Sequence, residues 1–265
     1  MLLAIDAGNT NVVFALFEGD KVVGSWRIST SRQRTGDEYA VWLVQLMRDK
    51  GISREMVDGC VIASVVPPAT FNLRKLVTDH FGVEPVVIGD PGVDLGIAVK
   101  LEGAVGADRV VNALAARETY KAPLIVIDFG TATTFDIVDA TGAYVGGVIC
   151  PGINLSAEAL HNAAAMLPKI DIVQPPHAII GTNTIHAMQS GIFWGYIGLI
   201  EGLVSRIKAE MHGDGMDGKD AAPITVVGTG GLASLFAKAT DSIQQIDGDL
   251  TLRGLKLVYQ LNQKP

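Results

Sequence analysis

Residues 2–10 read LLAIDAGNT and residues 124–134 read LIVIDFGTATT. Each stretch is an apolar run that ends in Asp-x-Gly and continues into short hydroxyl and amide side chains. A second apolar stretch follows each one, at residues 12–17 and 135–138. The two aspartates, Asp6 and Asp128, lie 122 residues apart. A similarity at that distance predicts two copies of one domain rather than a short repeat.

Each copy is typical of a β-hairpin with a tight polar turn at its tip. Gly8 and Gly130 tolerate positive φ and carry no Cβ that would obstruct a ligand. Successive backbone N–H groups in such a turn form a concave anion site. Short donors surround these groups, namely Asn9, Thr10, Thr131, Thr133 and Thr134. The pattern favours a clamp for a polyphosphate, with an ordinary Asp-Gly hairpin as the alternative.

Two acidic residues occupy places where phosphate would bind, Asp6 and Asp128. A carboxylate repels phosphate unless a cation lies between the two groups. The motif therefore predicts a metal ion or another cation at each turn.

Composition limits the class of protein. The chain has 265 residues, 48% of them hydrophobic and 18% charged, with a net charge of −7 and no cluster of Lys and Arg. This predicts two globular domains and no surface for nucleic acid or anionic membranes. The first residues enter a strand without a basic segment, and Cys60 and Cys150 lie far apart, so we expect a cytoplasmic protein with free thiols. The five histidines show no metal-binding spacing.

The order of elements indicates an α/β fold with two domains, residues 1–109 and residues 110–265. Strands are expected as a three-stranded meander over 2–28 and then at 59–66, 85–88, 124–128, 134–138, 143–149 and 223–227. Helices are expected from about 37 to 47 and at 71–81, 110–120, 153–165, 183–211, 232–239 and 252–261. The segment 211–220 is predicted to be a surface loop.

Two glycine-rich segments suggest nucleotide chemistry. Residues 228–233 read GTGGLA after an apolar strand, which fits a contact with a nucleotide base or ribose, a dinucleotide-binding turn, or a plain strand-to-helix turn. The first interpretation is favoured, because no complete nucleotide-binding βαβαβ unit follows. Residues 213–219 match G-x-x-x-x-G-K, but Asp220 stands where a P-loop needs Ser or Thr. We interpret that match as a coincidence.

Three further segments remain open between structural and functional roles. Asp108 in GADR (106–109) is either a helix N-cap or a carboxylate that accepts a hydroxyl proton, with Arg109 holding an acidic substrate. Thr182 or Asn183 is a helix cap by default, although a substrate could use the same helix start. The GGVICPG segment (146–152) is interpreted mainly as close backbone packing.

Together these motifs resemble the type III pantothenate kinases. The motifs DAGNTN (6–11), GADR (106–109), DFGTAT (128–133), GGVICPG (146–152) and NT with SG (183–184, 190–191) occur in the family's order. The resemblance covers the chain from Leu2 to about Leu257. It implies two ribonuclease-H-like domains around a nucleotide cleft, the duplicated actin-like ATPase fold.

The resemblance also implies roles for individual residues. Asp6 is similar to the residue beside Mg²⁺, Thr131 to a second phosphate contact, and Asp128 to the ligand of a monovalent cation (K⁺ or NH₄⁺). Asp108 resembles the catalytic proton acceptor, and Thr184 matches a substrate contact that comes from the neighbouring subunit. The first phosphate-binding hairpin would comprise Asp6, Ala7, Gly8, Asn9, Thr10, Asn11, Val12 and Val13. The pantothenate site would comprise Gly106, Ala107, Asp108, Arg109 and Thr184.

One segment departs from the family. Residues 100–105 read KLEGAV, whereas the family commonly has an Asn-Pro pair there. The assignment of Asp108 does not depend on this segment, but the shape of the loop before it does.

The implied activity is ATP-dependent phosphorylation of pantothenate to 4'-phosphopantothenate, the first step of coenzyme A biosynthesis. The implied assembly is a homodimer with a shared active site. Two alternatives stay open at this point. One is a non-catalytic family member that acts as an accessory factor in transcription, and the other is a related kinase for another small alcohol.

Overall fold

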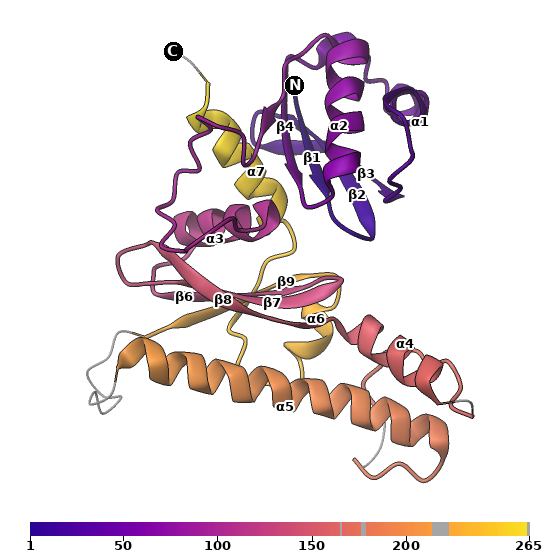
Figure 1. The fold of residues 1–265 in the computed structure, drawn as a ribbon, viewed down its shortest axis with the longest axis vertical. Helices are drawn as coiled ribbons and strands as arrows, with labels where there is room; N and C mark the ends of the chain where they lie inside the picture. Colours follow the sequence, from indigo (N-terminus) through magenta and orange to yellow (C-terminus); the bar gives the residue numbers. More distant parts are fainter. Residues whose placement is uncertain (165, 176–178, 214–222, 264–265) are drawn as a thin grey trace. The chain divides into compact units, whose positions relative to one another are not determined.

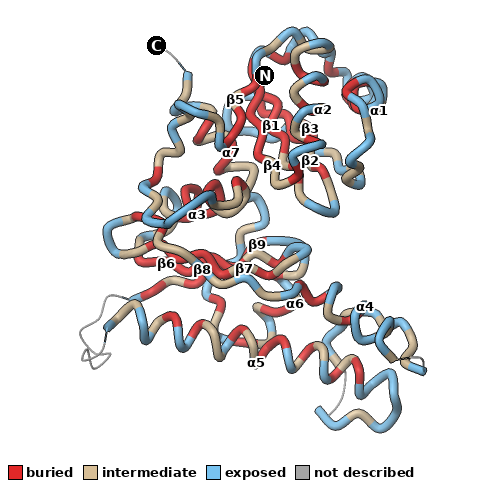
Figure 2. The backbone as a smooth tube through the Cα atoms, viewed as in Figure 1, coloured by how far each residue is buried: buried red, intermediate tan, exposed pale blue. Residues whose placement is uncertain are grey.

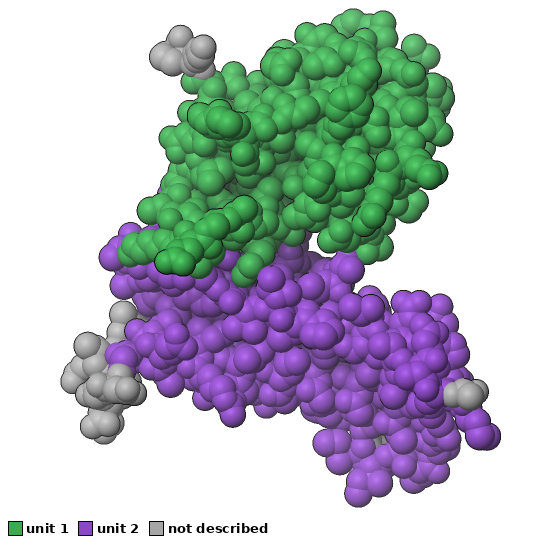
Figure 3. Space-filling view, viewed as in Figure 1, with its two compact units in different colours: residues 1–115, 249–265 green, residues 116–248 purple. Residues whose placement is uncertain are grey.

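The structure is a computed structural model that describes residues 1–164, 166–175, 179–213 and 223–263. The chain forms two compact units (Figure 3). Unit 1 comprises residues 1–115 and 249–265, and unit 2 comprises residues 116–248. Among the described residues, no helix combines the length and apolarity that a membrane crossing needs.

Unit 1 is built on a five-stranded mixed sheet in the order β3-β2-β1-β4-β5 (Figure 1). The strands are β1 (Leu2–Ala7), β2 (Asn11–Glu18), β3 (Lys21–Ser29), β4 (Gly59–Ser64) and β5 (Val86–Val87). The first three form the predicted antiparallel meander, and β4 and β5 continue the sheet in parallel. Because β1 is central and covered on both faces, its residues are almost uniformly apolar.

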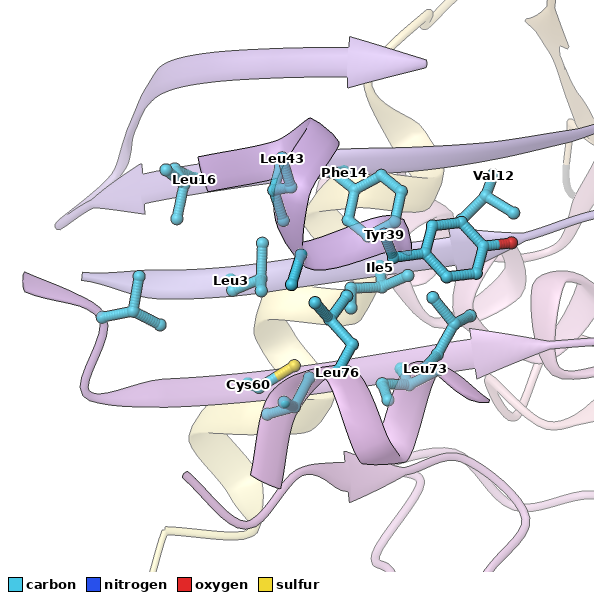
Figure 4. Close-up of a cluster of buried hydrophobic side chains, with 14 of the residues drawn as sticks. Leu3, Ile5, Val12, Phe14, Leu16, Tyr39, Leu43, Cys60, Leu73 and Leu76 are labelled. Carbon is cyan, nitrogen blue, oxygen red and sulfur yellow. The ribbon is translucent and has the colours of Figure 1, made fainter. Parts of the chain in front are cut away.

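Two helices pack on one face of this sheet, and their side chains share one core with it. The helix α1 (Gly36–Asp49) begins with a capping box between Thr35 and Glu38, and α2 (Pro67–Lys75) begins with proline in its first turn. A π-helical segment (Leu76–Phe81) continues α2, and a short 3-10 helix (Arg54–Met56) precedes β4. Figure 4 shows how side chains of these elements fill one core. Its labelled members are Leu3, Ile5, Val12, Phe14, Leu16, Tyr39, Leu43, Cys60, Leu73 and Leu76.

Unit 2 repeats this topology. Its sheet has the order β10-β9-β6-β7-β8, with β6, β7 and β8 antiparallel and β9 and β10 parallel to β6. The strands are β6 (Leu124–Phe129), β7 (Ala132–Val138), β8 (Tyr144–Pro151), β9 (Thr225–Gly230) and β10 (Gln245–Ile246). Reading from the third strand of each meander, both sheets follow the order 3-2-1-4-5. This confirms the predicted duplication of a ribonuclease-H-like domain.

One face of the second sheet is covered by α5 (Thr184–His212), a continuous helix of 29 residues (Figure 1). Buried residues recur along α5 at helical spacing, from Phe193 through Ile200 to Ile207, and pack on the β6 and β7 side chains. The shorter helices of unit 2 are α4 (Ile153–Ala163) and α6 (Ala233–Phe236).

The division into units differs from the predicted domain boundary after Arg109, which stays a prediction. The helix α3 (Ala107–Thr119) runs past that boundary, and the contact division falls after Ala115. The C-terminal helix α7 (Leu250–Leu261) belongs to unit 1, because it packs on β1 and β4. A glycine at position 59 makes this packing feasible, since a Cβ there would lie 1.8 Å from the Tyr259 hydroxyl oxygen.

Most of the predicted segment 211–220, and with it the P-loop-like match, lies outside the described residues. The two-residue strand β10 was not predicted.

Candidate active site

The turn between β1 and β2 is held open by backbone hydrogen bonds. The Gly8 N–H donates to the Asn11 carbonyl at 3.0 Å. Thr30, just after β3, donates its hydroxyl to the Gly8 carbonyl at 2.6 Å and its N–H to the Thr10 carbonyl at 2.9 Å. These hydrogen bonds fix the turn through its carbonyl groups. Asn9 and Thr10 are exposed at its tip. Such a turn can offer N–H groups to an anion.

The turn between β6 and β7 has the same plan. The Gly130 N–H donates to the Ala132 carbonyl at 3.1 Å, and both Gly130 and Thr131 are exposed. Gly152, which directly follows β8, lies against this turn. A Cβ on Gly152 would be 2.2 Å from the Thr131 carbonyl oxygen and 2.8 Å from that of Gly130. The second turn is therefore also supported on its carbonyl side, here by close backbone packing.

The aspartates Asp6 and Asp128 occupy matching positions near the ends of β1 and β6, and both are half-buried. Asp128 is in register with Thr229 of the neighbouring strand β9. At the next position, Gly230 has φ +88°, and a Cβ there would lie 2.6 Å from the Asp128 Oδ1. Only glycine fits this place, both for its backbone conformation and for the space that the carboxylate occupies.

The carboxylates of Asp6 and Asp128 are hard oxygen donors of the kind that Mg²⁺ and monovalent cations accept. Among the described residues, no group of three or more His, Cys, Asp and Glu side chains is arranged to hold a metal ion. A cation at either aspartate would therefore complete its coordination with phosphate oxygens, backbone carbonyls or water. This donor set fits a cation that arrives with a nucleotide.

The GADR segment forms the start of α3. The Gly106 carbonyl accepts from the Val110 N–H at 3.2 Å, so Gly106 is the last residue before the helix and Asp108 lies inside its first turn. The Asp108 Oδ1 accepts from the Arg109 N–H at 2.9 Å. A Cβ on Gly106 would lie 2.6 Å from the same oxygen, so glycine leaves room for the carboxylate.

Burial sets the electrostatics of Asp108. It raises the pKa of the carboxyl, and the Arg109 backbone N–H and guanidinium offset only part of that effect. A carboxylate with a raised pKa is a better proton acceptor than an ordinary aspartate, provided that it is ionised. Asp108 is therefore not the N-cap of α3, since it lies inside the first turn, and its role in proton transfer stays a prediction.

Thr184 is the exposed first residue of α5. The preceding Asn183 is the cap, because its side chain accepts from the His186 N–H at 2.9 Å. Thr184 borders an open hollow of about 760 Å³ that the last turn of α4 and the start of α5 enclose. Thr184 lies twelve positions before Tyr196 along the helix, about 18 Å at the usual rise. Tyr196 contacts Thr133 beside the second turn. Thr184, at the far end of this stretch of helix, therefore lies too far away to contact the turn of its own unit.

The predicted site residues thus divide between the units. The hairpin residues Asp6–Val13 and the segment Gly106–Arg109 belong to unit 1, and Asp128, Thr131 and Thr184 belong to unit 2.

Two supporting residues escaped the sequence analysis, Thr30 and Tyr196. Gly152 did not escape it, because close backbone packing was expected for its segment and is found. Thr30 and Gly152 immediately follow the third strand of their meander, a place that the duplicated pattern could have marked. Tyr196 has no signal in the sequence, because it lies in an apolar helix.

Comparisons with known proteins identify the family of the chain. Residues 2–206 match the family model described as type III pantothenate kinase. The chain is 57% identical to the type III pantothenate kinase of Rhodospirillum rubrum, over 99% of both chains. It is 55% identical to that of Rhodospirillum centenum, with the same coverage.

Solved structures support the fold. A conserved protein of the Baf family of transcriptional activators from Campylobacter jejuni matches with a TM-score of 0.59 at 19% identity, over 98% of both chains. An activator of 2-hydroxyisocaproyl-CoA dehydratase from Clostridium difficile, solved with ADPNP, matches with 0.51 at 13% identity, over 100% of this chain and 98% of that one. A 2-dehydro-3-deoxygalactonokinase from Sinorhizobium meliloti matches with 0.54 at 12% identity and the same coverage. These likenesses show the fold that sugar kinases and actin-like ATPases share, and nothing further.

Proposed function

The chain belongs to the type III pantothenate kinase family, and we propose how its residues carry out the reaction of that family. It is a kinase that uses ATP to phosphorylate pantothenate in coenzyme A biosynthesis. Our assignment of roles is supported by two matching Asp-x-Gly turns, one in each unit, and by a half-buried aspartate with a raised pKa at the start of α3.

Both turns bind phosphate groups of ATP in this proposal. The first contributes the backbone and side chains of Asp6–Val13, and the second contributes Thr131. Their carbonyl groups are already held by Thr30 in unit 1 and packed against Gly152 in unit 2. Because this support exists before the nucleotide arrives, the donors need little rearrangement to bind it. Phosphoryl transfer depends mainly on such positioning and on neutralisation of charge.

Cations belong to the same site. Asp6 would hold Mg²⁺ and Asp128 a monovalent cation such as K⁺ or NH₄⁺, with phosphate oxygens and water as the other ligands. When bound, these ions offset the negative charge of the phosphates. The exposed Gly230 and Gly231 beside Asp128 would let the nucleoside approach the backbone of β9.

Asp108 would accept the proton of the primary hydroxyl of pantothenate as the phosphoryl group transfers. Arg109 follows it in the same helical turn, and its guanidinium would bind the pantothenate carboxylate as a charge-assisted pair. Gly106 and Ala107 would contact the substrate through their backbone. The product is 4'-phosphopantothenate.

Replacing Asp108 with asparagine tests this assignment. Asp108→Asn keeps the shape of the side chain and its hydrogen bond from the Arg109 N–H, and it removes the proton acceptor. We expect kcat to fall by roughly 10²–10⁴-fold. The affinity for ATP, measured by calorimetry, should stay within about twofold of the wild-type value. Near-normal turnover by the variant would refute the role of Asp108.

We further propose that the chain acts as a homodimer with shared active sites. Large apolar side chains are exposed on α4, on the segment after it and at the start of α5. Figure 2 colours many residues of these segments as exposed. We call this the α4–α5 apolar surface: Leu155, Leu160, Met166, Ile179, Ile180 and Ile185. Exposed apolar groups gathered in one region are typical of an interface. Thr184 adjoins this surface, and its distance from the turn of its own unit fits a role in the site of the neighbouring subunit.

Mixing two inactive variants tests the shared site. Asp108→Asn lacks the proton acceptor, and Thr184→Ala lacks the substrate contact that it would lend to its neighbour. After subunit exchange, half of the sites in each mixed dimer hold both wild-type residues, so total activity should recover to about a quarter of the wild-type value. Co-purification of an untagged variant with an affinity-tagged one reports the extent of exchange. Full exchange without recovery would show that Asp108 and Thr184 do not serve the same site across subunits.

The comparisons give no support to a non-catalytic accessory role. A kinase for another small alcohol would show itself in a panel of alcohol substrates tested at equal concentration. We also propose a cytoplasmic location, in keeping with two free cysteines, Cys60 and Cys150.

A further inference from the structure

The Tyr196 side chain connects three elements of unit 2 beside the second turn. Its hydroxyl oxygen lies 2.8 Å from the Thr133 Oγ1 of β7, and the hydroxyl donates to the Pro151 carbonyl at the end of β8. Because Tyr196 uses its single proton on Pro151, the Thr133 hydroxyl must donate to Tyr196. The result is one directed chain, from Thr133 through Tyr196 to Pro151, that ties two neighbouring strands to α5.

These hydrogen bonds end on the backbone next to Gly152, which supports the second turn. Thr133 is two residues after Thr131, and Pro151 directly precedes Gly152. Gly152 is the residue that packs against the carbonyls of Gly130 and Thr131. A shift of Pro151 would therefore move Gly152 away from the turn or into it.

Burial makes the connection rigid. Tyr196 and Thr133 are both buried, with 6% and 1% of their surface exposed. The Tyr196 ring packs on Phe236 with 5.5 Å between the ring centroids. Burial also raises the pKa of Tyr196, so its hydroxyl keeps the proton that it donates to Pro151. The hydroxyl is thus a permanent donor in a packed environment, where a lost partner is costly.

We propose that Tyr196 is a positioning residue for ATP, which acts by fixing the Gly130–Thr131 turn through Thr133 and Pro151. It touches neither the nucleotide nor pantothenate. The inference rests on the proposed role of that turn in binding phosphate. It predicts a selective effect, because only the phosphate contact depends on the turn.

The variant Tyr196→Phe tests this directly. It keeps the ring and its packing and removes only the hydroxyl. We expect KM for ATP, and the Kd for a non-hydrolysable ATP analogue measured by calorimetry, to rise roughly 5–20-fold, the loss of about one hydrogen bond. KM for pantothenate should stay within about twofold, a split that general destabilisation does not produce.

Two further variants serve as controls. Val204→Ala removes buried volume from the same helix two turns further on and leaves both hydroxyl bonds intact; at a matched loss of thermal stability it should not change the affinity for ATP. Thr133→Val removes the other hydroxyl with little change in shape. If both residues act through the same chain of hydrogen bonds, their effects should not add. The double variant Thr133→Val/Tyr196→Phe should then bind ATP with about the affinity of the single variant that binds it more weakly.

The outcomes separate this inference from the proposed function. If Tyr196→Phe binds the analogue as tightly as the wild type, or if Val204→Ala weakens binding equally, the positioning role is refuted. If the wild type binds ATP but does not phosphorylate pantothenate, the substrate assignment fails while the binding data still decide the role of Tyr196. If the wild type binds no ATP, both proposals fall.

Discussion

At the scale of single residues, Asp108 is a carboxylate whose partial burial is unfavourable and whose proposed role is to accept a proton. Its carboxylate is partly desolvated at the start of α3, and the Arg109 N–H and guanidinium compensate only in part, so its pKa is raised. The ionised form that accepts a proton is also the form that burial disfavours. Active sites commonly keep such costly groups because catalysis needs them.

The raised pKa predicts a pH dependence. A protonated Asp108 cannot accept the hydroxyl proton, so kcat/KM for pantothenate should fall as pH is lowered through the pKa of Asp108. Because that pKa is raised, the fall should begin at a higher pH than for an ordinary aspartate. A pH–rate profile measures this limb. A profile that stays flat down to the ordinary aspartate range would contradict the proposed state of Asp108.

The stability of the fold should depend on pH in the opposite direction from kcat/KM. The pKa of Asp108 is higher in the folded than in the unfolded chain, so its contribution to stability is fully present below the unfolded pKa and is lost as pH rises through the folded pKa. Asp108→Asn removes this loss. We expect the variant to melt at a higher temperature than the wild type at neutral pH, with the difference shrinking in acid. A lower melting temperature at neutral pH would show that the carboxylate stabilises the fold.

The sequence could reveal Asp108 because it stands in a compact motif with Gly106 and Arg109. It could not reveal Tyr196. That residue follows the helical spacing of an apolar face, where a tyrosine normally fills a core, and only tertiary contacts bring its hydroxyl to Thr133 and Pro151.

At the scale of elements, the hairpins were predictable because their signals are local. An apolar run, an Asp-x-Gly turn and a second apolar strand predict the pairing of β1 with β2 and of β6 with β7. Helix starts were harder. A helix was expected over 71–81, whereas α2 begins earlier, at Pro67, since proline suits the first turn of a helix. The strand β10 is too short for any periodicity to appear.

Gly152 gives a prediction at this scale. Its φ of −65° suits any residue, so Gly152→Ala tests space alone. The new Cβ would lie 2.2 Å from the Thr131 carbonyl oxygen and would displace the second turn. We expect kcat/KM for ATP to fall roughly 10–100-fold, as misplaced contacts reduce positioning.

Gly195→Ala is the matched control, because it has open space around its Cβ position on the exposed side of α5. It should stabilise the helix by about 0.5–1 kcal/mol and leave kinetics unchanged. Equal kinetics for Gly152→Ala and the wild type would show that the close packing has no effect on the turn.

At the scale of the whole molecule, duplication was the most predictable feature, because two copies of one motif lie a domain length apart. The assignment of α7 to unit 1 was not. Its apolar face would suit either sheet, and only the packing on β1 and β4 decides. Nothing in a linear pattern tells a terminal helix which of two similar sheets it will cover.

The assembly also gives a prediction. Ile180 is 80% exposed in the α4–α5 apolar surface, so Ile180→Asp should cost the single chain little stability. If this surface is the dimer interface, the variant should be monomeric in light scattering and should lose most of its activity, since a buried unpaired charge is costly. Val41, on α1 in unit 1, is 76% exposed, so Val41→Asp is the control and should remain dimeric. A dimeric, active Ile180→Asp would place the interface elsewhere.

The most direct test of the central claim is the release of ADP by the wild-type protein with ATP, Mg²⁺ and pantothenate, measured first in K⁺ and then in Na⁺. We predict ADP release that depends on pantothenate, is faster in K⁺ than in Na⁺, and loses this preference in Asp128→Ala. The absence of pantothenate-dependent ADP release from a folded protein that binds ATP would contradict the claim that these two turns and Asp108 form a pantothenate kinase site.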